Sequence, residues 1–160
     1  MTGPDTSAFR RILTGIFPAQ VNNDYRGHTV ALVLFIPLTL VTIARSLIHI
    51  FKEDGGAQTI ATIPLDIYPP AAAQAIVTIF ALWGLAQLLL GLFYSVVILR
   101  YRNLLPCMYL LVFIEYISRH IILWYQPIET LGTAPGGMIN LYVTPVALVL
   151  MFLALPKTQG

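Results

Sequence analysis

Ionisable side chains occur at helical spacing inside two of the most apolar stretches of the chain. Glu115 and Arg119 are four residues apart, so on a helix they share one face in the order that favours an ion pair. Arg45 and His49 have the same spacing in an earlier stretch, and His120 follows Arg119 directly. If the two stretches pack together, these five side chains form a candidate ligand-binding cluster for an anion.

The charges of this cluster leave its role open. One carboxylate facing two arginines leaves a formal charge of +1 with neutral histidine, so an anion, a carboxylate headgroup or water can complete it. The alternative is a structural ion-pair network that fixes helix register. Arg45 or Arg119 can also extend to the nearby headgroups, which would dissolve the cluster.

Aromatic residues repeat along another face of the stretch that contains Glu115 and Arg119. A wall of an apolar ligand pocket is one interpretation of this pattern, and ordinary packing with interfacial aromatics is the other. The residues are Tyr109, Phe113, Tyr116 and Trp124, with His120 between this face and the cluster.

Composition shows what must position these residues. The 160-residue chain is 58% hydrophobic and only 10% charged, whereas soluble domains carry about 25% charged residues. A hydrocarbon core needs about 20 apolar residues per helical span. Four stretches meet that length, and we predict an all-α, four-helix membrane bundle over residues 28–156, with spans 28–51, 71–99, 104–125 and 138–155.

Two segments lie outside these spans. Residues 1–27 contain apolar positions at helical spacing, with Arg10 and Arg11 on the other side of the helix. This predicts a short amphipathic helix that lies in the headgroup layer or packs under the bundle. The outer loop 52–70 alternates Ile63, Leu65 and Ile67 around Pro64, which favours an extended flap over the outer mouth rather than a plain linker.

Lysine and arginine predict the orientation. Positive flanks are retained in the cytoplasm, so both termini should be cytoplasmic, and in a bacterium the membrane would be the inner membrane. On the opposite side of the predicted spans only Lys52 flanks a span end. The cytoplasmic set is Arg10, Arg11, Arg26, Arg100, Arg102 and Lys157.

Small residues follow one face of the second span. Gly84, Gly91 and Ser95 allow close helix packing, within the chain or in a homo-oligomer. The lipid bilayer is the expected partner, with an anionic lipid or small carboxylate as the candidate ligand. Nucleic acid is excluded because basic residues occur only in ones and twos.

The sequence lacks the residues that metal binding, nucleotide binding and hydrolase chemistry require. A lone cysteine, Cys107, and three histidines provide no metal cluster, and no nucleotide-binding or hydrolase motif occurs. His28 lies at the opposite membrane surface from His49 and His120, which argues against a bis-histidine haem. We therefore expect neither a cofactor nor a metal.

Short motifs resemble a group of small bacterial inner-membrane proteins. They are the run 54–57 (DGGA), the run 102–111 (RNLLPCMYLL), and Glu115-Tyr116 with Arg119. The resemblance implies four spans and no assigned activity, and the layout is also similar to sterol-isomerase-like and DoxX-like proteins.

Three functions stay open at this point. The protein binds or conducts a small anionic or amphiphilic ligand through the cluster. Alternatively, it is an intramembrane enzyme in which Glu115 and His49 or His120 act as acid and base on a lipid-like substrate, or it is a structural or assembly subunit of a membrane complex.

Overall fold

The computed structural model describes residues 4–157, and all regular secondary structure in that range is helical. The helices are α1 Pro4–Ile16, α2 Thr29–Phe51, η1 Leu65–Ile67, α3 Pro70–Arg100, η2 Arg102–Leu104, α4 Leu105–Tyr125 and α5 Pro135–Ala154. Four helices, α2 to α5, are long and apolar enough to cross a membrane. The predicted all-helical, four-span fold class with a short N-terminal helix is confirmed.

Helix ends follow proline chemistry closely. α3 and α5 begin at Pro70 and Pro135, because the first helical position needs no backbone N–H donor and suits the fixed φ of proline. α5 therefore begins three residues before the predicted Met138. The first three residues of the predicted amphipathic segment lie outside the described range.

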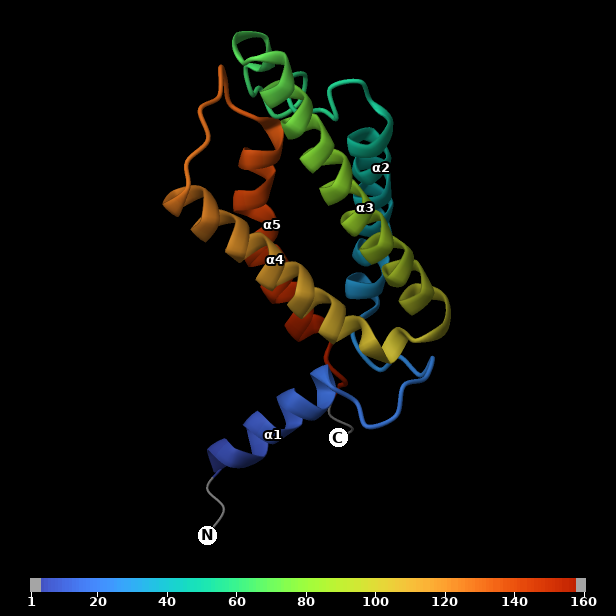
Figure 1. Ribbon diagram of the computed structural model, residues 1–160. Helices are drawn as coiled ribbons and strands as arrows, with labels where there is room; N and C mark the ends of the chain where they lie inside the picture. Colours follow the sequence, from blue (N-terminus) through green and yellow to red (C-terminus); the bar gives the residue numbers. More distant parts are fainter. Residues whose placement is uncertain (1–3, 158–160) are drawn as a thin grey trace.

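The four long helices form two antiparallel pairs, α2 with α3 and α4 with α5 (Figure 1). The end that carries α1 and the last turn of α5 is here called the terminal side, and the opposite end, with loops 52–69 and 126–134, the loop side. The short link between the second and third spans, residues 100–103, predicts that α3 and α4 form an antiparallel hairpin of packed neighbours. However, α3 and α4 diverge from that link and make few contacts, because a short link fixes only one end of each helix.

Three aromatic rings hold the two pairs together toward the terminal side. Phe35 of α2 packs edge-on against Tyr94 of α3 and Tyr109 of α4, with both ring centroids 5.0 Å away. The Tyr109 hydroxyl donates a hydrogen bond to the carbonyl oxygen of Ala31 at 2.7 Å. All three rings are buried, so this is the centre of the hydrophobic core.

Glycines bring α2 and α3 into close contact. A Cβ added at Gly84 would lie 2.7 Å from the Cβ of His49, and one at Gly91 would lie 2.7 Å from Cγ1 of Ile43. The small-residue face of the second span is therefore occupied by α2 of the same chain. The backbone approach that glycine permits at these two positions is thus used within the chain, which is one of the two packing arrangements predicted for this face.

The amphipathic helix α1 packs on the bundle along one edge only. Ile16 is buried and Ile12 is half-buried against the bundle core. Phe9, Leu13 and Phe17 on the neighbouring edge remain exposed. α1 therefore has one apolar edge packed on the bundle and a second one free, and it runs obliquely away from the bundle (Figure 1).

The segment between α1 and α2 is tied to the terminal side. The side-chain amide of Asn103 donates to the Gln20 carbonyl oxygen at 2.7 Å, and its oxygen accepts from the Asn22 N–H at 3.0 Å. The His28 N–H donates to the carbonyl oxygen of Leu153, at the end of α5, at 2.8 Å. Nδ1 of His28 also caps the start of α2. These bonds tie the segment between α1 and α2 to the link 101–104 and to the end of α5.

The loop after α2 is compact rather than the extended flap that the alternating aliphatics indicated. Gly55 and Gly56 have φ of +57° and +76°, and successive turns follow them to residue 61. Ile63 and Leu65 are buried against α3, whereas Ile67 is exposed. The alternation of aliphatic residues did not predict an extended strand correctly, because the positive φ angles of Gly55 and Gly56 and the η1 turn change the direction of the chain.

A second contact closes the loop side. The carbonyl oxygen of Thr62 accepts from the Leu131 N–H, and the Thr62 hydroxyl donates to the Gly132 carbonyl oxygen, both at 2.9 Å. Thr62 adopts φ of +58°, a strained conformation for a β-branched residue. The loop on the α2–α3 pair thus binds the loop on the α4–α5 pair.

Candidate functional site

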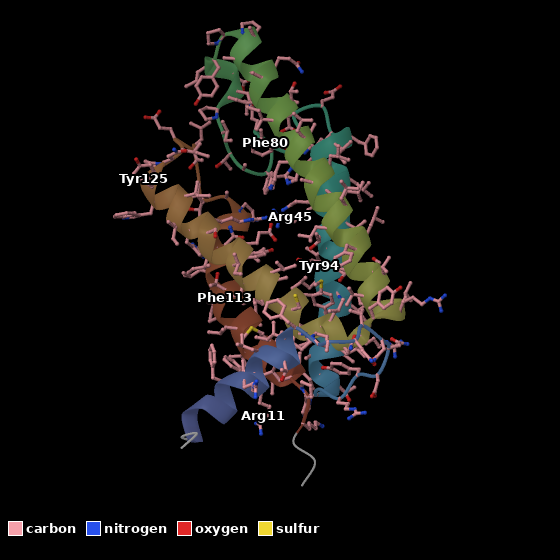
Figure 2. All side chains as sticks on the ribbon, turned by 60° about the horizontal axis from the view of Figure 1, so that its bottom comes forward. Arg11, Arg45, Phe80, Tyr94, Phe113 and Tyr125 are labelled. Atoms are coloured by element: carbon pink, nitrogen blue, oxygen red, sulfur yellow. The ribbon has the colours of Figure 1, made fainter. Side chains whose placement is uncertain are left out.

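Trp83 of α3 joins the charged residues of the two helix pairs. The guanidinium carbon of Arg45, from α2, lies 5.9 Å from the Trp83 ring centroid. The guanidinium carbon of Arg119, from α4, lies 5.1 Å from the same ring and 4.8 Å from the ring of Tyr116. Distances within about 6 Å allow cation–π attraction. Arg45 extends from α2 into the region between the pairs (Figure 2).

Glu115 is the carboxylate of this group. It forms an ion pair with Arg119 one turn later and accepts a hydrogen bond from the Gln87 side-chain amide of α3 at 3.3 Å. The Glu115 and Arg119 side chains are 29% and 16% exposed, so the pair is shielded but not sealed. The predicted Glu115–Arg119 pair is confirmed, and it reaches across to the other helix pair through Gln87.

His49 is fixed by the loop that follows its helix. Its Nδ1 lies 2.7 Å from the carbonyl oxygen of Gly55. A carbonyl oxygen only accepts, so Nδ1 carries the proton and a neutral ring presents Nε2 as an acceptor. The ring stacks at a tilt on Trp83, 4.8 Å between centroids, and edge-on against Phe80 at 5.5 Å.

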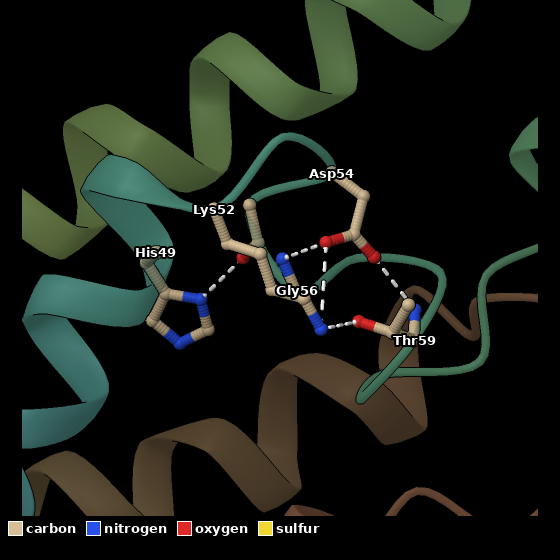
Figure 3. A network of polar contacts seen from close by, with 6 residues as sticks. His49, Lys52, Asp54, Gly56 and Thr59 are labelled. Carbon is tan, nitrogen blue, oxygen red and sulfur yellow. Dashed lines mark hydrogen bonds and ion pairs between the residues drawn. The ribbon is translucent and has the colours of Figure 1, made fainter.

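Asp54 organises that loop from outside the helices (Figure 3). Its carboxylate accepts hydrogen bonds from the N–H groups of Gly56 at 2.9 Å and Thr59 at 2.7 Å, and it pairs with Lys52. Burial alone would raise the pKa of Asp54, but these N–H donors and the Lys52 charge outweigh it and lower the pKa to about 2. The carboxylate thereby holds the turn whose carbonyl fixes His49.

The structure brings together four of the five predicted cluster residues. Arg45, His49 and Arg119 gather on Trp83, and Glu115 joins them through Arg119. We call the set Arg45, His49, Trp83, Gln87, Glu115 and Arg119 the Trp83 cluster. The fifth predicted residue, His120, is half-buried on α4, and within residues 4–157 its buried Nε2 has no hydrogen-bond partner.

The aromatic residues predicted as a pocket wall lie in different surroundings. Tyr109 is fully buried in the core and Phe113 packs on its edge. Tyr116 lies under the Arg119 guanidinium, whereas Trp124 is 85% exposed. These four aromatic residues therefore do not form one pocket wall. Of the four, only Tyr116 lies beside the Trp83 cluster.

Polar side chains on α2 that accompany Arg45 in the sequence do not join the cluster. Thr39, Thr42 and Ser46 each donate to the carbonyl oxygen four residues earlier, at 2.7–2.9 Å. Such bonds satisfy a hydroxyl within its own apolar helix. The hydrogen bonds of these three hydroxyls therefore stay within α2.

Trp83, Phe80 and Gln87 are the site residues that sequence reasoning missed. Trp83 and Phe80 lie in a 31-residue helix that is apolar on all sides, so no periodic contrast marks them. Gln87 offered a signal, since a buried amide in an apolar span needs a partner. Its four-residue spacing from Trp83 would have pointed to the same face.

Comparison with known proteins gives no match to a family model, to a curated protein or to a solved structure. The resemblance to small bacterial membrane proteins therefore depends on the short motifs alone. Among residues 4–157, no three His, Cys, Asp or Glu side chains gather closely enough to hold a metal ion. The chemistry available at the cluster is that of guanidinium, imidazole, carboxylate and indole groups.

Proposed function

We propose that this protein binds a small anionic or amphiphilic ligand at the Trp83 cluster. The observation that carries the proposal is that two guanidinium groups from different helix pairs share one indole but only one carboxylate. Arg119 is neutralised by Glu115, whereas Arg45 forms no ion pair with any described residue. A cation in an apolar helix is costly without a partner, and an anionic group is the partner that fits.

Unpartnered polar atoms in the same cluster support a ligand with a donor as well as a charge. His49 and Gln87 are each only 6% exposed. Nε2 of His49 and Oε1 of Gln87 have no hydrogen-bond partner among the described residues, although buried polar atoms are nearly always paired. A headgroup that carries both an anionic oxygen and a hydroxyl offers the charge for Arg45 and a donor for these acceptor atoms.

The placement of the cluster favours an amphiphile over a free ion. The cluster lies where the two helix pairs diverge, and the outer surfaces of those helices carry large exposed apolar side chains. An acyl chain can occupy the bilayer beside the helices while its headgroup contacts Arg45. Conduction of such a ligand would use the same cluster.

Two other functions have less support. Glu115 is held by two donors, Arg119 and Gln87, which suits a fixed counter-ion better than an acid that gives up and regains a proton. The small-residue face that would serve an assembly subunit is covered by α2. Ligand binding is therefore the function that the arrangement of side chains favours.

We also propose that the protein resides in a bacterial inner membrane with both termini in the cytoplasm. Arg26, Arg100, Arg102 and Lys157 lie on the terminal side, near the helix ends. On the loop side, Lys52 is paired with Asp54. This asymmetry agrees with retention of positive flanks in the cytoplasm.

Dodecanoate titration of the purified protein in a nonionic detergent, followed by thermal unfolding, tests the binding proposal. Dodecanoate should raise the midpoint by several degrees and uncharged dodecanol should not, since only the carboxylate can pair with Arg45. The double variant Arg45→Gln/Arg119→Gln should lose the shift. The matched control Arg10→Gln/Arg100→Gln removes the same charge elsewhere and should keep it. Equal shifts in both variants would show that the cluster is a structural network.

A further inference from the structure

A cationic hollow lies on the terminal side, away from the Trp83 cluster, where α1 meets the end of α5. Gly15 allows the approach, because a Cβ there would lie 2.9 Å from Cδ2 of Leu155 and 3.1 Å from Cδ of Pro156. The hollow has a volume of about 210 Å³ and is lined by Arg11 of α1 and Lys157 beyond α5, together with Ile12 and Thr14.

Its two cations come from separate elements and lack acidic partners. Arg11 and Lys157 form no ion pair with any described residue. Asp24, in the segment that follows α1, is paired with Arg26 at 2.7 Å. The hydroxyl of Thr14 is directed to its own helix, where it donates to the carbonyl oxygens of Arg10 and Arg11. Among the side chains that the structure describes, none compensates the positive charge of the hollow.

Apolar side chains are exposed on a different edge of α1 from the one that lines the hollow. Phe9, Leu13 and Phe17 form an exposed edge of α1, 65%, 41% and 57% exposed. Phe152 and Leu153 are exposed on the last turn of α5 nearby. A helix that carries an apolar edge on one side and basic side chains on another has the pattern of a helix that lies at the bilayer surface among anionic lipids.

We propose that α1 and the end of α5 form a binding site for an anionic phospholipid. Arg11 and Lys157 contact the lipid phosphate from two sides, and Phe9, Leu13 and Phe17 lie among the acyl chains. The volume supports a headgroup as occupant, since it is below the roughly 300–1,000 Å³ of sites that enclose a whole small molecule. The bound lipid would fix α1 against the bundle.

Native mass spectrometry of the full chain with phosphatidylglycerol or phosphatidylcholine tests this site. We expect phosphatidylglycerol adducts to exceed phosphatidylcholine adducts, and Arg11→Gln/Lys157→Gln to weaken the preference at least about tenfold. Arg10→Gln/Arg100→Gln removes the same charge on the same side and should keep the preference within about threefold. Equal loss in both variants, or no preference in the wild type, would overturn the proposal.

Two further measurements keep this site separate from the Trp83 cluster. Arg45→Gln/Arg119→Gln should retain the phosphatidylglycerol preference, whereas its loss there alone would assign the lipid to the cluster and overturn the α1 site. In a Cys107→Ser background, a spin label at Leu13→Cys should be more accessible to oxygen than to a nickel chelate, and one at Thr14→Cys the reverse. Equal accessibility at both positions would contradict immersion of the apolar edge.

Discussion

Nδ1 of His49 lies 2.7 Å from the carbonyl oxygen of Gly55, so the last turn of α2 is bonded to the first turn of the loop that follows it. The same imidazole stacks on Trp83, whose ring lies near both Arg45 and Arg119. The His49 side chain thus links the loop 52–69 to the Trp83 cluster.

Replacement of His49 by alanine should destabilise the protein. It would leave the Gly55 carbonyl without its partner and remove the ring packed on Trp83, at a cost of about 2–4 kcal/mol. Reversible unfolding in mixed micelles measures the change. Val41→Ala, at a position of α2 that is 58% exposed, is the control and should cost less than about 1 kcal/mol. Equal costs at both positions would contradict the role of the Gly55 bond.

Replacement of Glu115 by glutamine should also destabilise the bundle. Arg119 would lose its carboxylate partner while remaining 16% exposed. Because the pair is shielded but reached by solvent, the cost should lie between that of buried and surface pairs, about 2 kcal/mol. Glu129→Gln, in the exposed loop 126–134, should leave the unfolding free energy unchanged. An unchanged value for Glu115→Gln would mean that Arg119 already finds another partner.

Glycine substitutions should separate packing from backbone effects. Gly84→Ala places a Cβ 2.7 Å from His49 Cβ and 3.0 Å from the Ser46 carbonyl oxygen, so α2 and α3 must move apart, at about 1–3 kcal/mol. Gly136→Ala meets nothing within 4 Å in the first turn of α5 and should stabilise by up to about 1 kcal/mol. Unfolding curves of the two variants should therefore shift in opposite directions.

The fold was predictable because length and hydropathy alone define a membrane span. The pairing of spans was not, since lipid offers no polarity contrast that marks which face of α3 meets α2 or α4. The short link 101–104 indicated an α3–α4 hairpin, yet the close packing is between α2 and α3, where Gly84 and Gly91 meet α2. Small residues carried that information, but they did not reveal whether the partner was the same chain.

The charged residues of the site could be predicted from the sequence, whereas Trp83 at its centre could not. Rare charged residues in apolar spans stand out, so Arg45, Glu115 and Arg119 could be found by type and spacing. Trp83 could not, because an aromatic residue in such a helix normally faces lipid or packs in the core. The bond that fixes His49 depends on the left-handed turn at Gly55, which only the folded loop defines.

Asp54 should make the loop sensitive to acid. Its folded-state pKa of about 2 lies below the ordinary value of 3.8, so its contribution to stability is complete above about pH 4 and is lost as the pH falls toward 2. Wild-type protein should lose thermal stability over that interval. Asp54→Asn should be less stable at neutral pH and show a flatter acid limb, because the single amide oxygen cannot accept from both N–H groups in place of the two carboxylate oxygens. Parallel acid limbs would contradict this assignment.

Cysteine labelling should establish which side of the membrane each end faces. In a Cys107→Ser background, Lys157→Cys places a thiol on the terminal side and Glu129→Cys places one in the loop 126–134, both at exposed positions. If positive flanks are retained in the cytoplasm, a membrane-impermeant maleimide added to intact cells should label position 129 and leave position 157 unlabelled until the membrane is permeabilised. The two positions serve as controls for one another, since they flank the same helix, α5, at opposite ends. The reverse labelling pattern would place Arg11, Arg26 and Lys157 outside, and the lipid site at α1 would then face the external leaflet.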